Sequence, residues 1–348
     1  MGGRDVFVFI DGTGCDLETK TNGSLLLEEV KGEPNVKVIY QPGVGTYSDM
    51  PWFQRAFSSE IRREVSTVYR RLCDADVGKN DRVYILGYSR GAIIARMVAQ
   101  MLTAPNARDS IIQKSNQLEV IAPQVCFLGL YDPVIGFPYF FPKMKYELNA
   151  VTNEKILRYV EVIAMDDQFL LFPRRSGVRQ YEQVVIPGNR PSEAPALATV
   201  ADTRRNQLNP TRVVEMNRHF IALPGVHGEI GGQGGDSGIR NHAFFVMLSL
   251  LSASSPRIQK ILESNGNPTL WQKLAFRPIC VGRESTLLDK YLLRWRRRFI
   301  GIRSIQVHPL ADELCGQTGV YRNRIFGRWR KYCVPSGLHE NERFGRGH

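Results

Sequence analysis

The pentapeptide Gly87-Tyr88-Ser89-Arg90-Gly91 lies between a predicted buried strand and a predicted buried helix. Before it, residues 83–86 form a continuous apolar run, which is typical of a central parallel strand covered on both faces. After it, residues 92–102 are apolar on nearly all sides, which favours a helix packed inside an α/β core. The two glycines allow a sharp turn, so the Ser89 hydroxyl can stand above the sheet at the helix N-terminus. The pattern predicts a nucleophile elbow.

A serine nucleophile needs a histidine to take its proton, and the histidine needs a carboxylate to orient it. Asp132 ends the apolar run 125–131, which predicts a place at the carboxyl edge of a parallel sheet. His227 follows the apolar run 220–226 and enters a loop rich in glycine, so we expect it to be the base. An Asp after a strand is often only a turn residue. If Asp132 has that role, the nearest alternative acids are Asp166 and Asp167.

Acyl transfer also needs donors for the oxyanion that develops on the substrate carbonyl. One predicted donor is the N–H of Arg90, the residue after the nucleophile. For the second donor we expect Gly12 or Thr13, because glycine lets the backbone approach a substrate closely. The alternative is that Asp11-Gly12-Thr13 is only a tight turn. The Arg90 side chain has two candidate partners, a buried carboxylate or a lipid phosphate.

Several further segments occur in the same order as the motifs of a known family. They are Val6–Ile10 followed by Asp11-Gly12-Thr13, then Thr21-Asn22, QPGVGT at 41–46, GYSRGA at 87–92, LGLYDPV at 128–134 and PGVH at 224–227. In these motifs the chain resembles the phospholipase-like α/β-hydrolase domain of bacterial type VI secretion lipase effectors. The resemblance covers roughly residues 6 to 250, and several collinear motifs are more specific than one pentapeptide.

This resemblance implies an esterase that acts on the acyl chains of glycerophospholipids, with Ser89, Asp132 and His227 as its catalytic triad. The chain departs from the family at Cys15, where Asn is common, and at Glu229, where the family usually has Asp followed by G-G-G-Y. A serine triad needs no metal, so we expect no cofactor. The acidic position of the family makes calcium at Glu229 the one ion to test.

The apolar runs predict strands near 6–10, 36–40, 83–88, 124–131 and 219–224. In residues 52–73 apolar side chains recur every three or four positions, which predicts an amphipathic helix that crosses between parallel strands. The expected fold class is therefore α/β and α/β-hydrolase-like. It has a mostly parallel central sheet with helices on both faces, and a basic C-terminal extension follows it.

The 348 residues exceed the usual length of one domain, but α/β-hydrolases often carry lids and appendages. We expect a catalytic domain over residues 1–255 and a basic C-terminal region over 256–348. Residues 133–150 open with an aromatic and proline-rich run directly after the candidate acid, which favours a lid or acyl-chain wall over an ordinary packed loop. Residues 176–215 are polar and indicate an excursion at the rim of the site.

Positive charge is concentrated near the C-terminus. The chain has a net charge of +12, and residues 283–348 hold 14 Lys and Arg against 6 Asp and Glu. Cations alternate with aromatic residues there, which suits an anionic lipid surface because Trp and Tyr prefer its interface. A nucleic acid, or docking to a protein, would also suit such a stretch. The candidate membrane-binding residues are Arg294, Trp295, Arg296, Arg297, Arg298, Arg328, Trp329 and Arg330.

No apolar run approaches the roughly 20 residues of a transmembrane helix, and the first residues lead into a strand with no signal peptide. We therefore expect synthesis in the cytoplasm, and the resemblance implies export by type VI secretion. The six cysteines show no metal-ligand spacing and are expected to be reduced. The expected partners are a phospholipid membrane surface and, by the resemblance, a secretion-system component or an immunity protein. Nucleic acid is not an expected partner.

Three functions are compatible with these observations. The first is a lipolytic serine hydrolase that forms an acyl-enzyme on Ser89. The second is a carboxylesterase for small acyl esters. The third is a catalytically silent hydrolase-fold module whose basic C-terminal region engages nucleic acid or a protein partner. Labelling by a fluorophosphonate would separate the enzymes from the binding module, because only an activated serine reacts.

Overall fold

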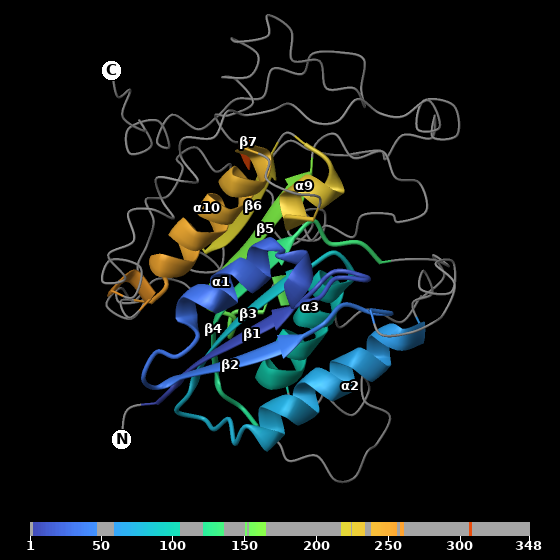
Figure 1. Ribbon diagram of the computed structural model, residues 1–348. Coiled ribbons are helices and arrows are strands. Elements are labelled where there is room, and N and C mark those ends of the chain that lie inside the picture. Colours follow the sequence, from blue (N-terminus) through green and yellow to red (C-terminus); the bar gives the residue numbers. More distant parts are fainter. Residues whose placement is uncertain are drawn as a thin grey trace, which may run out of the picture.

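The computed structural model describes residues 3–46, 59–104, 121–135, 150–151, 153–164, 217–223, 225–233, 238–255, 258–260 and 306–307. In the described residues a parallel sheet is covered by helices on both faces (Figure 1). This arrangement confirms the expected α/β-hydrolase-like class. No helix among these residues is long and apolar enough to cross a membrane.

The described strands form one sheet in the order β2-β1-β3-β4-β5-β6-β7, and each pairing between neighbours is parallel. Tyr88 pairs with Tyr131 and Ala164 pairs with Leu223, so the ends of these strands lie along one carboxyl edge. Loops that leave this edge are the usual place for ligands of parallel sheets. The strands are β1 (Asp5–Ile10), β2 (Val36–Gln41), β3 (Arg82–Tyr88), β4 (Gln124–Tyr131), β5 (Tyr159–Ala164), β6 (Arg218–Leu223) and β7 (Gln306–Val307).

Helices cover the two faces of the sheet because alternate residues of a strand point to opposite sides. In β1, Val6 and Val8 belong to the apolar cluster that contains α2 and α3, whereas Phe7 and Phe9 belong to the cluster that contains α1 and α10. Figure 1 shows α2 and α3 on one side of the strands and α1 and α10 on the other. The described helices are α1 (Asn22–Val30), α2 (Ser59–Asp74), α3 (Arg90–Thr103), α9 (His227–Gly231) and α10 (Gly238–Ser252), with the 3-10 turn η1 (Leu17–Thr19).

The five predicted strands are confirmed as β1, β2, β3, β4 and β6, with ends that differ by at most one residue. The predicted helix over 52–73 is confirmed from residue 59 onward as α2, and its first residues lie outside the described part of the chain. Strand β5 was not predicted. Its third residue is Glu161, whose charge interrupts the apolar pattern, yet Glu161 is fully buried and accepts a 2.6 Å hydrogen bond from Arg96.

Part of the predicted C-terminal region joins the sheet. Gln306 and Val307 form β7 and pair with Ile221 and Ala222 of β6. The boundary expected at residue 255 stays a prediction. Residues 136–149 of the expected lid and the whole excursion 176–215 lie outside the described residues.

Candidate active site

Ser89 lies on the turn between β3 and α3 in a backbone conformation that side chains rarely adopt, with φ of 58° and ψ of −124°. The glycines on either side allow this turn. A Cβ built on Gly87 would lie 2.6 Å from the carbonyl oxygen of Gly91, and a Cβ on Gly91 would lie 2.3 Å from the carbonyl oxygen of Ile10. A larger residue at Gly91 would push the elbow away from β1, and one at Gly87 would collide with the first turn of α3, so both glycines are needed where the pentapeptide places them.

Neighbouring strands hold the Ser89 backbone at the carboxyl edge of the sheet. Its N–H donates to the carbonyl of Tyr131 at 3.0 Å, and its carbonyl accepts from the N–H of Val134 at 3.3 Å. Ser89 immediately precedes α3, so its hydroxyl stands at the positive end of a helix of 14 residues. A strained backbone conformation at a residue of this kind is typical of a functional site.

Asp132 follows β4 directly and is fully buried. Its N–H donates to the carbonyl of Val162 at 2.8 Å, which ties the residue to β5. One carboxylate oxygen, Oδ1, accepts from the N–H of Ala164 at 3.2 Å. The other, Oδ2, lies 2.7 Å from Nδ1 of His227. The carboxylate is therefore fixed by the backbone on one side and faces the imidazole on the other.

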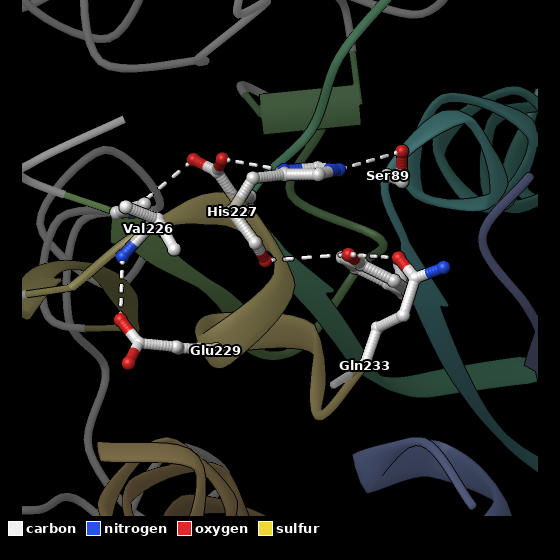
Figure 2. A network of polar contacts seen from close by, with 8 residues as sticks. Ser89, Val226, His227, Glu229 and Gln233 are labelled. Atoms are coloured by element: carbon white, nitrogen blue, oxygen red, sulfur yellow. Dashed lines mark hydrogen bonds and ion pairs between the residues drawn. The ribbon is translucent and has the colours of Figure 1, made fainter. Parts of the chain in front are cut away.

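His227 is the first residue of α9, just beyond the end of β6. Its Nε2 lies 2.9 Å from Oγ of Ser89. Figure 2 draws this contact as a dashed line. An ionised carboxylate can only accept, so Nδ1 of His227 carries the proton that points to Asp132, and Nε2 is free to accept the Ser89 proton. The structure thus brings together all three residues predicted to form the triad, from three separate loops at the carboxyl edge of the sheet. Their catalytic role remains a prediction.

The short helix that carries His227 is fixed at both ends. The carboxylate of Glu229 accepts a 2.9 Å hydrogen bond from the N–H of Val226 (Figure 2). At the other end, the side-chain amide of Asn22 donates to the carbonyls of Ile230 at 3.0 Å and Arg240 at 3.3 Å. Asn22 of the T-N motif therefore supports the helix that carries His227, although the two residues lie far apart in the chain. Sequence reasoning missed this function of Asn22, because nothing in the spacing indicates which distant loop it reaches.

Glu229 was the candidate calcium ligand. Its Oε2 caps the first turn of α9 through Val226. Within the described residues, no group of three or more His, Cys, Asp or Glu side chains lies close enough to hold a metal ion. Calcium binding at Glu229 stays a prediction.

The predicted oxyanion donors lie around the N-terminus of α3. Arg90 is the first residue of that helix, where backbone N–H groups point outward along the helix axis. Its buried side chain reaches the loop after β1, and its Nε donates to Oγ1 of Thr13. The N–H of Gly12 already donates to Oδ1 of Asp11 at 2.8 Å. Among the predicted donors, the geometry therefore favours Arg90 and Thr13 over Gly12.

The loop after β1 forms a turn and packs against a second motif, while its role as an oxyanion donor stays a prediction. It contains a tight turn, in which the N–H of Cys15 donates to the carbonyl of Gly12 at 2.9 Å. It also lies against the 41–46 motif, because a Cβ built on Gly43 would lie 1.6 Å from the carbonyl oxygen of Gly12. The two motifs are in backbone contact beside the elbow.

Asp11, at the start of this loop, connects it to other segments through hydrogen bonds. It is 1% exposed and accepts hydrogen bonds from Tyr40 Oη at 2.8 Å, from Thr21 Oγ1 at 3.1 Å and from Gly12 N–H. Burial raises the pKa of the Asp11 carboxyl to about 6, and the hydrogen bonds oppose this shift without cancelling it. A polar network at this position was not predicted, because Tyr40 and Thr21 come from two other segments of the chain.

The remaining predicted site residues cannot be placed. The alternative acids Asp166 and Asp167 lie outside the described residues, as do all eight candidate membrane-binding residues between Arg294 and Arg330.

Comparison with known proteins supports the family resemblance. One family model matches residues 4–105, and it describes the catalytic domain of Tle1-like phospholipase effectors of the type VI secretion system. No curated protein matches the chain.

Three solved structures are among those to which the chain is similar. One is an uncharacterised protein from Pseudomonas aeruginosa, with 15% identity and a TM-score of 0.42 over 80% of this chain and 51% of that chain. A Tle1 effector bound to the VgrG spike of the type VI secretion system has 18% identity and a TM-score of 0.35 over 67% of this chain and 52% of that chain. Acyl-protein thioesterase 2 from Zea mays has 12% identity and a TM-score of 0.37 over 72% of this chain and 95% of that chain. The chain spans about half the length of the first two proteins.

Proposed function

We propose that the protein is a lipolytic serine hydrolase that cleaves the acyl ester bonds of glycerophospholipids. The observation that carries the proposal is the continuous contact from Ser89 Oγ to His227 Nε2 at 2.9 Å and from His227 Nδ1 to Asp132 Oδ2 at 2.7 Å. This is the geometry in which an imidazole can accept a serine proton while a buried carboxylate stabilises the imidazolium that forms.

In the first half of the reaction, Ser89 Oγ attacks the ester carbonyl while Nε2 of His227 takes the hydroxyl proton. The carbonyl oxygen becomes an oxyanion, and the N–H groups of Arg90 and Thr13 are the proposed donors to it. The intermediate then collapses, and the bond between the acyl carbon and the glycerol oxygen breaks. His227 gives its proton to that oxygen, so the lysophospholipid leaves with a hydroxyl group and not as an alkoxide.

In the second half, water replaces the alcohol. Nε2 of His227 takes a proton from the water as it attacks the acyl carbon of the acyl-enzyme. The second tetrahedral intermediate collapses, the proton passes from His227 to Oγ of Ser89, and a fatty acid is released. Asp132 stays ionised throughout and keeps Nδ1 protonated.

The match to the phospholipase effector catalytic domain over residues 4–105 supports a phospholipid over a small ester as the substrate. The same match supports delivery by a type VI secretion system. A secretion-system component and an immunity protein are accordingly the proposed protein partners, and a phospholipid membrane surface is the proposed site of action.

The test combines labelling with turnover. The purified protein should react with a fluorophosphonate, and Ser89→Ala should abolish both this reaction and ester hydrolysis while the protein stays folded. Ser66→Ala is the matched control, because the Ser66 hydroxyl lies on α2 and is bonded to the carbonyl of Arg62 at 2.9 Å. Unchanged activity of Ser89→Ala would refute the proposed triad.

The substrate class needs a separate measurement. Mass spectrometry of the products from a phospholipid panel should show a fatty acid and a lysophospholipid. Turnover confined to short-chain soluble esters would identify a small-ester carboxylesterase instead. A wild-type protein that reacts with no fluorophosphonate and turns over no ester would indicate the binding module.

A further inference from the structure

Tyr88 fills the space between the loop after β1 and the helix that carries His227. It is the last residue of β3, directly before Ser89, and it is 1% exposed. A Cβ built on Gly12 would lie 2.5 Å from Cδ1 of Tyr88, and one on Gly231 would lie 2.1 Å from Cε2. Since Cδ1 and Cε2 belong to opposite edges of the ring, each glycine leaves room for one edge of it.

The same side chain contacts both the backbone and the ring of His227. Tyr88 Oη donates toward the carbonyl of His227 and toward Oε1 of Gln233, each at 3.3 Å. Figure 2 shows His227 and Gln233 on this network. A hydroxyl has one proton, so the two acceptors share it. The Tyr88 and His227 rings lie 5.0 Å apart between centroids, with their planes inclined by 31°.

His227 needs such a support. Its side chain is 24% exposed, so burial alone does not fix the imidazole. The hydrogen bond that Nδ1 donates to Asp132 fixes the position of Nδ1 but leaves the ring able to turn about that contact. A second contact on the ring and a third on the backbone would set the direction in which Nε2 points.

Resting on the proposed function, we propose that Tyr88 is a positioning residue that holds His227 in line with Ser89. Because Tyr88 is covalently joined to Ser89, one residue links the turn that carries the nucleophile to the helix that carries the base. Because Gly231 has no side chain, α9 packs closely against the Tyr88 ring. The Tyr88 hydroxyl holds the His227 carbonyl in place. Catalysis depends steeply on such alignment, since a displacement of about 1 Å can cost about 100-fold in rate.

Two substitutions separate the contributions of the hydroxyl and the ring. Tyr88→Phe removes only the hydroxyl, and we expect kcat to fall about fivefold, as for the loss of one hydrogen bond. Tyr88→Leu also removes the ring, and we expect kcat to fall about 100-fold. The KM for a soluble short-chain ester should stay unchanged in both variants, because Tyr88 acts through His227 and does not contact the substrate.

Tyr84 provides the matched control. It lies on the same strand, is also 1% exposed and stacks on Phe7 with ring centroids 4.9 Å apart. Tyr84→Phe and Tyr84→Leu should lower stability as the Tyr88 variants do, but leave kcat and KM of the folded protein unchanged. The folded fraction is measured by circular dichroism for every variant before kcat is compared.

The result that overturns the proposal is a Tyr88→Phe variant with wild-type kcat, or Tyr88 variants that lose activity only in proportion to their unfolded fraction. A rise in KM with kcat unchanged would also overturn it, because Tyr88 would then act on substrate binding. Failure of the proposed function would be seen earlier and separately, as a wild-type protein that neither reacts with a fluorophosphonate nor hydrolyses an ester.

Discussion

Replacing Asp11 by Asn is expected to stabilise the protein at neutral and alkaline pH. Burial raises the pKa of the Asp11 carboxyl from 3.8 to about 6, against the hydrogen bonds of Tyr40, Gly12 and Thr21. Well above about pH 6 the carboxylate is charged in the folded and unfolded states alike, and the shift corresponds to about 3 kcal/mol of lost stability. Removing the charge should recover an amount of that order.

Asparagine can keep part of the same network. Its oxygen would accept from the N–H of Gly12, which now donates to Oδ1 of Asp11 at 2.8 Å. Its amide nitrogen would face Tyr40 Oη and Thr21 Oγ1, which now donate to Oδ2 of Asp11 at 2.8 Å and 3.1 Å. A hydroxyl both donates and accepts, so the two can turn to receive the amide protons. The amide protons therefore find acceptors, but the protons of the two hydroxyls lose Oδ2, and this loss subtracts from the gain.

The sign of the pH dependence follows from the direction of the pKa shift. Because the folded pKa of Asp11 lies above the unfolded one, the folded state binds more protons between about pH 4 and pH 6. The contribution of Asp11 to the free energy of unfolding thus rises as the pH falls through this range. The advantage of Asp11→Asn should be largest near pH 8, at up to about 3 kcal/mol, and should shrink toward zero as the pH falls below about 4. Urea unfolding followed by circular dichroism across this range measures the difference.

Asp81→Asn is the control with the opposite sign. Burial raises the pKa of the Asp81 carboxyl, but hydrogen bonds from Arg4 and Gly78 outweigh it, so the net pKa is lowered. Its stabilisation is present above the unfolded pKa and is lost as the pH falls. Asp81→Asn should therefore cost stability at neutral pH, and the cost should shrink on acidification. A destabilised Asp11→Asn near pH 8, or a difference from wild type that is constant with pH, would refute the reasoning.

Three further predictions concern activity. Asp132→Asn should lower kcat for ester hydrolysis by about 10⁴-fold, because the amide no longer holds the required tautomer of the base; a nearly silent variant would transfer the role of the acid to the pair at 166–167. Activity should survive a chelator, since a serine triad needs no metal, whereas complete loss with rescue by calcium would reveal a site at Glu229. Replacing the three arginines at 296–298 by Glu should lower turnover of anionic liposomes and spare a soluble short-chain ester, because each such cation near the surface contributes about 1 kcal/mol. Equal loss on both substrates would mean that these arginines stabilise the fold instead.

The elbow could be predicted because its constraints are local. The turn at Ser89 needs residues without side chains at Gly87 and Gly91, and the flanking strand and helix are visible as apolar runs. Asp132 and His227 were found by the same reasoning, since each follows an apolar run that ends at the carboxyl edge of the sheet. Periodicity and strand ends are properties of short segments, so the sequence displays them directly.

Strand β5 and helix α1 were missed for physical reasons. In β5 the buried charge of Glu161 is compensated by Arg96 at 2.6 Å and by the Tyr159 hydroxyl at 2.8 Å. Glu161 therefore follows the rule that buried charges are paired. In α1 the first turn contains Gly23, a poor helix former, whose lack of a side chain admits the ring of Phe9. Both elements depend on partners that only the fold supplies.

Local apolar patterns and the chain order of strand ends predict the fold class and the three residues that meet at the elbow. How those residues are held depends on contacts between segments that lie far apart in the chain. Asn22 reaches the helix of His227, Tyr88 lies between Gly12 and Gly231, and Asp11 accepts hydrogen bonds from two other segments. The physical reason is that hydrogen bonds and close packing between distant segments depend on ångström-scale distances, which the periodicity of a sequence does not encode.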